Sequence, residues 1–348
     1  MKKTYTRRER LAAGAAVGVV AAFPATTSAQ TIERKKVTIA VGGKNLLYYL
    51  PLTIAESLGY FKAEGLELTI NDFAGGAQSL RALVGGSVDV VSGAFEHTVN
   101  MQAKGQKLRA FALMGRAPQI VLGVSPKTLP NFRTVADLKG KKIGVTAPGS
   151  STNVMANFVL AKAGLKPTDV SFIGVGASSG AVAAMRSGQI DAISNLDPVI
   201  TLLQRSGDLK IVSDTRIVAE ADKVFGGPMP AGCLYAKSEF VEKNPATVQA
   251  LATAIVRADK WIQAAGPGDI IKAVPESYLL GDRAVYIDAF LAAKGALSPD
   301  GLFPEKGPDT AFRALASIDA EIAAAKLDLA AVYTNEFAKK ANARYPKA

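Results

Sequence analysis

The chain has 348 residues, and we expect two α/β lobes because one domain usually holds about 100–200 residues. It is 49% hydrophobic and 20% charged, which excludes an intrinsically disordered protein, and its 32 glycines lack the three-residue period of collagen. A single cysteine excludes an intramolecular disulfide framework and a cysteine-based zinc site, and a single histidine excludes a histidine-cluster metal site. We therefore expect no metal site and no cofactor.

The first 29 residues have the pattern of a secretory signal peptide. A basic segment precedes an apolar stretch of 13 residues, Leu11–Phe23, which is too short to cross a bilayer of about 30 Å. Pro24 follows, and Thr27-Ser28-Ala29 supplies the small residues that signal peptidase accepts. We predict cleavage near Ala29 and a periplasmic location, with a short membrane anchor as the alternative. The Arg7-Arg8 pair leaves the twin-arginine export route open beside the Sec route.

The charge of the remaining chain argues against a nucleic-acid partner. Cleavage after Ala29 removes five cations and Glu9, so the formal net charge falls by four, from +11 to +7. No run of four or more lysines and arginines is present. A basic patch of that kind is the usual footprint of nucleic-acid binding, so we expect no nucleic-acid partner.

The chain after residue 36 alternates strands and helices. Short apolar or alternating segments predict strands at 37–41, 66–70 and 88–91. Helical spacing predicts helices at 51–58 and 77–84, and a further helix ends at 104 after a loop at 92–97. This order is typical of a parallel sheet covered by helices on both faces.

The same order then returns further along the chain. It predicts strands at 142–145, 170–173 and 190–194 and helices at 153–163 and 181–186. Residues 80–92 match residues 182–194 at a constant offset of 102 positions, which pairs Gly86 with Gly188 and Asp89 with Asp191. Glycine at this place ends a helix in the left-handed conformation. We interpret the two aspartates as acceptors for nearby backbone N–H groups, not as catalytic acids.

Two extended segments, 119–124 and 231–236, flank the second copy and are expected to cross between the lobes as hinges. We therefore predict lobe 1 at 37–118, lobe 2 with its crossing segments at 119–230, and a return to lobe 1 at 231–348. The rest of the chain is predicted to be mostly helical, with helices at 245–264, 311–325 and 328–341.

Ligands of open α/β sheets bind beyond the carboxyl ends of the strands. This rule selects six loops, at 42–50, 74–78, 92–97, 148–153, 174–180 and 195–198. Gly149–Thr152 and Ala177–Gly180 each open a helix, where free N–H groups favour an anion. Helix capping without a ligand is the equally weighted alternative, because serine and threonine are preferred caps.

The candidate catalytic residues are few. No G-x-x-x-x-G-K-[ST] motif and no complete G-x-G-x-x-G fingerprint is present. His97 beside Glu96 is more typical of ligand contact or hydrogen bonding than of a general base, and Cys233 is typical of a small buried apolar residue. Of Tyr48 and Tyr49, we expect one to contact a ligand and the other to line the core.

Five segments give the chain a resemblance to a known family: 51–55, 59–66, 85–89, 137–145 and 188–192. In these segments the chain resembles the NMT1/THI5-like periplasmic substrate-binding proteins of ABC importers for nitrate, sulfonates, taurine and bicarbonate, a group that includes thiamine-pyrimidine-precursor proteins. The resemblance covers about 37 to 340. It implies an α/β, two-lobed periplasmic-binding-protein fold of type II with two crossing hinge strands.

The resemblance also implies a function without catalysis. A monomer would capture a small solute between its lobes and deliver it to the membrane subunits of an ABC permease. The implied ligand contacts lie on the six loops: Tyr48, Gly76, Ala77, Glu96, His97, Ser150, Ser151, Thr152, Ser178, Ser179, Asn195 and Asp197.

The charge of these loops departs from what an inorganic anion needs. They hold no arginine that would clamp a sulfonate, while Glu96 and Asp197 are acidic. The solute thus stays open between a sulfonate-like or taurine-like anion and an aromatic or heterocyclic compound, such as a thiamine-pyrimidine precursor. In this family, the enzyme of pyrimidine synthesis carries a cysteine-rich iron motif, and this chain lacks that motif. An extracytoplasmic sensor is a further alternative.

Overall fold

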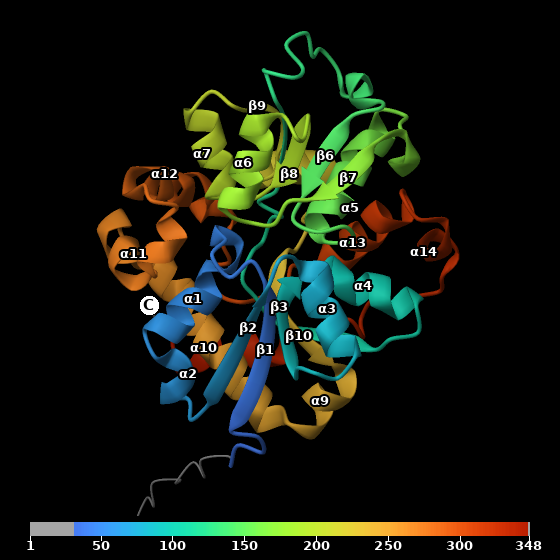
Figure 1. Ribbon diagram of the computed structural model, residues 1–348. Coiled ribbons are helices and arrows are strands. Elements are labelled where there is room, and N and C mark those ends of the chain that lie inside the picture. The colour runs from blue at the N-terminus through green and yellow to red at the C-terminus, as the bar shows by residue number, and fades with distance from the viewer. Residues whose placement is uncertain (1–30, 347–348) are drawn as a thin grey trace, which may run out of the picture. The chain divides into compact units, whose positions relative to one another are not determined.

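The computed structural model describes residues 31–346, and its strands form two five-stranded sheets (Figure 1). The predicted signal peptide lies outside the described residues. The first sheet has the strand order β2-β1-β3-β10-β4 and contains β1 (Lys36–Gly42), β2 (Glu67–Phe73), β3 (Val90–Ala94), β4 (Leu108–Leu113) and β10 (Gly232–Lys237). The second has the order β7-β6-β8-β5-β9 and contains β5 (Val121–Val124), β6 (Lys142–Val145), β7 (Ser171–Gly174), β8 (Ala192–Asn195) and β9 (Lys210–Asp214).

The two sheets have the same topology. In each, three parallel strands are followed by an antiparallel strand that comes from outside the β-α-β repeat, β10 in the first sheet and β5 in the second. The 102-residue repeat corresponds to equivalent places, since β3 begins at Val90 and β8 at Ala192. Gly86 and Gly188 both adopt the left-handed conformation, with φ of 79° and 80°. We call each sheet with the helices packed on it lobe 1 and lobe 2; the predicted residue boundaries of the lobes stay a prediction.

Fifteen α-helices are present among residues 31–346. The first eight are α1 (Leu50–Ser57), α2 (Tyr60–Ala63), α3 (Gly76–Val84), α4 (Glu96–Ala103), α5 (Ser151–Lys162), α6 (Ser179–Ser187), α7 (Val199–Arg205) and α8 (Val218–Phe225). The others are α9 (Ser238–Lys243), α10 (Pro245–Ala264), α11 (Pro267–Ala273), α12 (Arg283–Ala293), α13 (Gly307–Ala316), α14 (Ala320–Ala324) and α15 (Glu336–Arg344). Short 3-10 helices lie at Leu47–Tyr49, Val135–Leu138, Pro167–Asp169, Glu276–Leu279 and Lys294–Ala296.

Two crossing segments, 114–120 and 215–231, join the lobes. The first leads from β4 to β5, and the second leads from β9 through α8 to β10. They are hydrogen-bonded to each other at one end, where Thr215 N donates to Ile120 O at 3.1 Å. At the other end Ala231 N donates to Gly115 O at 2.9 Å. The segments that the sequence predicted to cross overlap β5 and β10, and the residues that join the lobes come immediately before these strands.

The repeated aspartates have the structural role that the sequence predicted. Asp89 accepts a hydrogen bond from Thr38 N, and Asp191 accepts one from Lys142 N, each at 2.9 Å. Each carboxylate thereby ties the start of its strand to the neighbouring parallel strand. Neither is a lining residue of the cavity described below.

Three predicted elements are wrong in extent. The loop predicted at 92–97 is short, because β3 continues to Ala94 and α4 begins at Glu96. The helix predicted at 311–325 is two helices, since the Asp319 side chain accepts from two N–H groups and starts α14 anew. The helix predicted at 328–341 begins only at Glu336, because the residues before it pair with the edge of β4, where Ala110 N donates to Val332 O. No helix within residues 31–346 is long and apolar enough to span a membrane.

Candidate ligand-binding site

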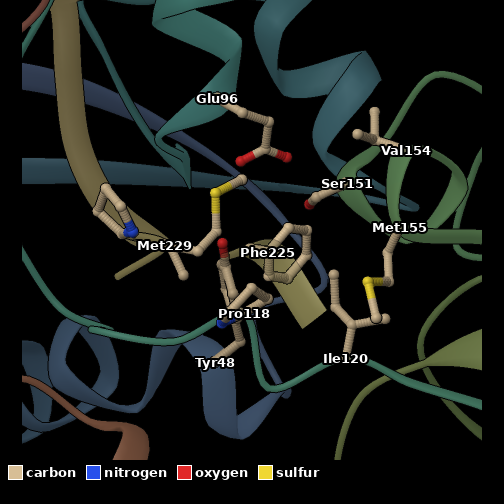
Figure 2. Close-up of a pocket in the computed structure, with 11 residues that line it drawn as sticks. Tyr48, Glu96, Pro118, Ile120, Ser151, Val154, Met155, Phe225 and Met229 are labelled. Atoms are coloured by element: carbon tan, nitrogen blue, oxygen red, sulfur yellow. The ribbon is translucent and has the colours of Figure 1, made fainter. Parts of the chain in front are cut away.

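A cavity lies where both lobes and both crossing segments meet (Figure 2). It contains about 300 Å³ of space free of protein atoms, part of it open to solvent. Only about 20 Å³ of it can hold the centre of a water-sized sphere, which is room for about one water molecule, so the lobes must separate before a solute can enter. Its lining residues are Tyr48, Glu96, Pro118, Ile120, Ser151, Val154, Met155, Phe225, Met229, Pro230 and Ala231.

The wall of the cavity is mostly apolar, and the crossing segments supply a large part of it. Pro118 and Ile120 come from the first segment, and Met229, Pro230 and Ala231 come from the second. Phe225, at the end of α8, stacks on Phe158 of α5 with ring centroids 4.9 Å apart. A solute in this cavity would therefore contact the same residues that must change conformation if the lobes move.

Glu96 is the one charged residue among the lining residues. It is the first residue of α4, its side chain is 3% exposed, and its Oε1 has no hydrogen-bond partner. Burial raises the pKa of Glu96 to about 7, although its own backbone N–H and the Ser151 side chain act in the opposite direction. Figure 2 shows the carboxylate directed toward the space between Ser151 and Met229. Near neutral pH, the ionised and the protonated forms of Glu96 are therefore both populated.

The neighbouring His97 is neutral and points elsewhere. Burial lowers the pKa of His97 to about 4, and its Nδ1 lies 3.1 Å from the hydroxyl of Tyr235. The ring is 1% exposed, and His97 is not a lining residue of the cavity. Cys233 is fully buried on β10, and burial raises the pKa of its thiol. Neither side chain is placed to act as a base or nucleophile on a molecule in the cavity.

Direct hydrogen bonds connect the lobes beside the cavity. Ala77 N donates to Ser150 Oγ at 3.0 Å, and Asn45 Nδ2 donates to Ala177 O at 2.8 Å. Leu47 N donates to the backbone oxygen of Asp197 at 3.0 Å. The loops that the sequence selected therefore face one another in pairs, one from each lobe.

The predicted site residues fall into several groups. Tyr48, Glu96 and Ser151 line the cavity. Ala77 and Ser150 lie at the contact between the lobes, and Gly76 is buried beside His97 within lobe 1. The side chains of His97, Thr152, Asn195 and Asp197 are buried and form hydrogen bonds within one lobe, and Ser178 and Ser179 are exposed.

The three hydroxyl-bearing residues of the loop at 150–152 have three different roles. Ser150 binds the opposite lobe, Ser151 faces the cavity, and Thr152 accepts from Thr146 N at 3.1 Å. Both Tyr48 and Tyr49 are nearly fully buried, and of the two only Tyr48 lines the cavity. That Tyr48 contacts a ligand stays a prediction.

Sequence reasoning missed the apolar wall and one buried arginine. Arg216 follows β9 and forms ion pairs with Asp214 at 2.6 Å and with Asp197 at 3.2 Å. Its side chain is 7% exposed, and two carboxylates match its charge, so it does not offer a free guanidinium to an anion. The prolines and methionines within the crossing segments, such as Pro118 and Met229, were the sequence feature that could have indicated an apolar wall.

The strand order, the duplicated lobes and the cavity between them define a two-lobed periplasmic-binding-protein fold of type II. The model of the NMT1/THI5-like family matches residues 46–266, and the chain belongs to this family.

Individual relatives agree with this assignment. A solved structure of a protein from Bordetella bronchiseptica RB50 is 62% identical, with a TM-score of 0.90 over 91% of this chain and 100% of that chain. The alkanesulfonate-binding protein SsuA from Xanthomonas axonopodis pv. citri, bound to MOPS, is 21% identical, with a TM-score of 0.67 over 88% of this chain and all of that chain. The binding protein YtlA of Bacillus subtilis is 26% identical over 75% of this chain and 77% of its own length. A 4-amino-5-hydroxymethyl-2-methylpyrimidine phosphate synthase of Schizosaccharomyces pombe is 28% identical over 45% of this chain and 43% of its own length.

Proposed function

We propose that the protein is the solute-binding component of an ABC import system and captures a small organic solute between its lobes. The observation that carries this proposal is the cavity, which both lobes and both crossing segments line. The names of family relatives as binding proteins support it. The protein would act in the periplasm after removal of residues 1–29 and deliver the solute to the membrane subunits of a permease.

The mechanism that we propose is a shift between an open and a closed arrangement of the lobes. A solute that contacts residues of both lobes, such as Glu96 and Met155, binds the closed arrangement more strongly than the open one. Rotation would be taken up in the two crossing segments. The solute would thereby increase the population of the closed form that a permease recognises.

Binding without catalysis fits the chemistry of the cavity. Its ionisable and hydroxyl-bearing residues are Tyr48, Glu96 and Ser151, and no imidazole or thiol is among them. Ser151 has no adjacent imidazole, the base that most often activates a serine nucleophile, since His97 is directed toward Tyr235. An enzymatic role of the kind named for the synthase relative is therefore the weaker candidate.

A thermal-shift screen of the purified protein tests this proposal. The compounds are sulfonates, oxyanions, aromatic acids, amines and pyrimidines. A ligand at one hundred times its dissociation constant should stabilise the folded protein by about 2.7 kcal/mol. Small-angle scattering should show compaction with the ligand, and no turnover of the ligand should be detected. A protein that no compound stabilises or compacts would contradict the proposed function.

Ser151→Ala tests whether the cavity is the binding site. We expect it to weaken binding of the screened ligand without unfolding the protein, because Ser151 lines the cavity and starts α5. Ser178→Ala is the matched control, since Ser178 also precedes a helix but is exposed and does not line the cavity. Equal affinities for the two variants would count against this cavity.

A further inference from the structure

We propose that the solute is a small apolar molecule with a basic nitrogen, an amine or an amidine, and that this nitrogen binds Oε1 of Glu96. The inference rests on the proposed function and specifies its solute class. It also decides between the two solute classes that the sequence left open, because it excludes a sulfonate-like anion as the preferred ligand.

The first reason is the unmatched acid in the cavity. Glu96 is 3% exposed, and its Oε1 lacks a partner, while the rest of the wall is mostly apolar. A buried polar oxygen without a partner costs free energy, and a buried ionised carboxylate costs more unless a cation pairs with it. No lysine or arginine is among the lining residues, so the protein does not supply that cation at the cavity.

The second reason is a comparison with the corresponding turn of lobe 2. The residue 102 positions after Glu96 is Pro198, and Asp197 lies directly before it. Asp197 is equally buried, but it is paired with Arg216 at 3.2 Å and accepts from Thr201 N at 2.8 Å. One lobe therefore carries an acid with a cation partner, and the other carries an acid without one. The duplicated turn has no structural need for an unpaired carboxylate.

The third reason is the apolar wall around the carboxylate. Phe225 supplies an aromatic ring, and Met155 and Met229 supply polarizable thioethers. Aromatic rings attract cations, and methionine adapts to apolar bodies of different shapes. An anion in the same place would face the ionised carboxylate in a medium of low dielectric constant, where repulsion is strong.

A protonated Glu96 would instead donate a hydrogen bond and tolerate an anion, and a pH series separates the two cases. The buried titratable groups near Glu96 stay neutral between pH 5 and 8, because burial raises the pKa values of the tyrosines and the thiol and lowers that of the histidine. These groups are Tyr48, Tyr49, His97, Cys233 and Tyr235. Benzamidine remains protonated throughout this range. A change of its affinity with pH thus reports the ionisation of Glu96.

The experiment is calorimetric titration with compounds that share one ring and differ in charge. Benzylamine and benzamidine are the basic members, and benzoate and benzenesulfonate are the acidic members. The basic members should bind more tightly than the acidic ones. Benzamidine should bind roughly a hundredfold more weakly at pH 5 than above pH 8, since only about one carboxylate in a hundred is ionised two pH units below its pKa.

Two variants complete the test. Glu96→Gln keeps the shape of the side chain and should weaken benzamidine binding at least tenfold and remove its dependence on pH. Asp259→Asn is the matched control, because Asp259 is fully buried and has no partner for either oxygen but does not line the cavity. It should bind benzamidine like the wild type. Circular dichroism verifies that both variants are folded.

The outcomes distinguish failure of this inference from failure of the proposed function. Tighter binding of benzoate or benzenesulfonate, or stronger binding at low pH, overturns the inference and leaves a solute-binding protein. The same holds if the wild type and Glu96→Gln bind benzamidine equally, or if the ligand found in the wider screen carries no basic nitrogen. Failure of every compound in both sets contradicts the proposed function and the inference together.

Discussion

Gly75→Ala should hold the lobes apart while leaving each lobe folded. Gly75 precedes α3 in lobe 1 and has an extended backbone with φ of −169°, which alanine adopts without strain. A Cβ at this position would lie 2.8 Å from Cβ of Ala147 and 2.9 Å from Oγ of Ser150, both in lobe 2. Real Cβ atoms essentially never approach other atoms this closely, so the lobes must separate or shift.

The size of the effect follows from the cost of overpacking. One extra methyl group in a close-packed contact costs typically 1–3 kcal/mol. Here the cost falls on the closed arrangement alone, because the atoms in conflict belong to different lobes. Since 1.4 kcal/mol corresponds to a factor of ten, the closed form should become roughly 5- to 150-fold less populated relative to the open form. The affinity for a solute that needs closure should fall by up to the same factor, and by all of it where the open form already predominates.

Small-angle scattering and calorimetry measure these two consequences. We expect a larger radius of gyration for Gly75→Ala without ligand, and a weaker affinity for the compound found by screening. Gly268→Ala is the control, since a Cβ at Gly268 would contact nothing within 4 Å. A variant as compact as the wild type and equal to it in affinity would refute the reasoning, because the lobes would then tolerate the methyl group.

Three further predictions concern individual carboxylates. Asp197→Ala should destabilise the fold by about 3 kcal/mol, because it leaves Arg216 with one carboxylate partner. Asp288→Ala, at an exposed ion pair, should cost less than about 1 kcal/mol. Urea unfolding measures both free energies. Asp191→Ala should cost about 1 kcal/mol through the lost hydrogen bond to β6, and an unchanged unfolding midpoint would contradict that role. The pKa of Glu96 is raised on folding, so the native state binds the proton more tightly than the unfolded chain, and the stability of the ligand-free protein should fall by about 3 kcal/mol as pH rises from about 4.5 to 7. Glu96→Gln should lose this slope, and an equal slope in both proteins would show that another group titrates.

Local sequence was enough to predict the framework of both sheets. The strands at 37–41 and 142–145 are short apolar segments, and burial on both faces of a parallel sheet demands that composition. Gly86 and Gly188 mark the same helix end twice, because each residue takes a left-handed conformation that costs other residues free energy. The duplication could therefore be read from a few positions whose requirements are local.

The wall of the cavity could not be predicted in this way. Pro118, Ile120 and Met229 come together only because two crossing segments more than 90 residues apart in sequence are hydrogen-bonded to each other. The hydroxyl loop at 150–152 is ambiguous for a related reason. A serine that opens a helix looks the same in sequence whether it binds a solute, as proposed for Ser151, or the opposite lobe, as Ser150 does.

The residues that join the lobes differ from those that line the cavity, and this difference explains how one fold can bind different solutes. The contacts that join the lobes use backbone groups and small side chains, such as Ala77 N with Ser150 Oγ and Leu47 N with Asp197 O. Such contacts can form whichever solute is enclosed. The apolar wall and the unpaired carboxylate of Glu96 come instead from residues that the repeat does not duplicate in kind. Substitutions there should change which solute binds while the lobes still close, whereas substitutions at Gly75 or Ser150 should change closure for every solute alike.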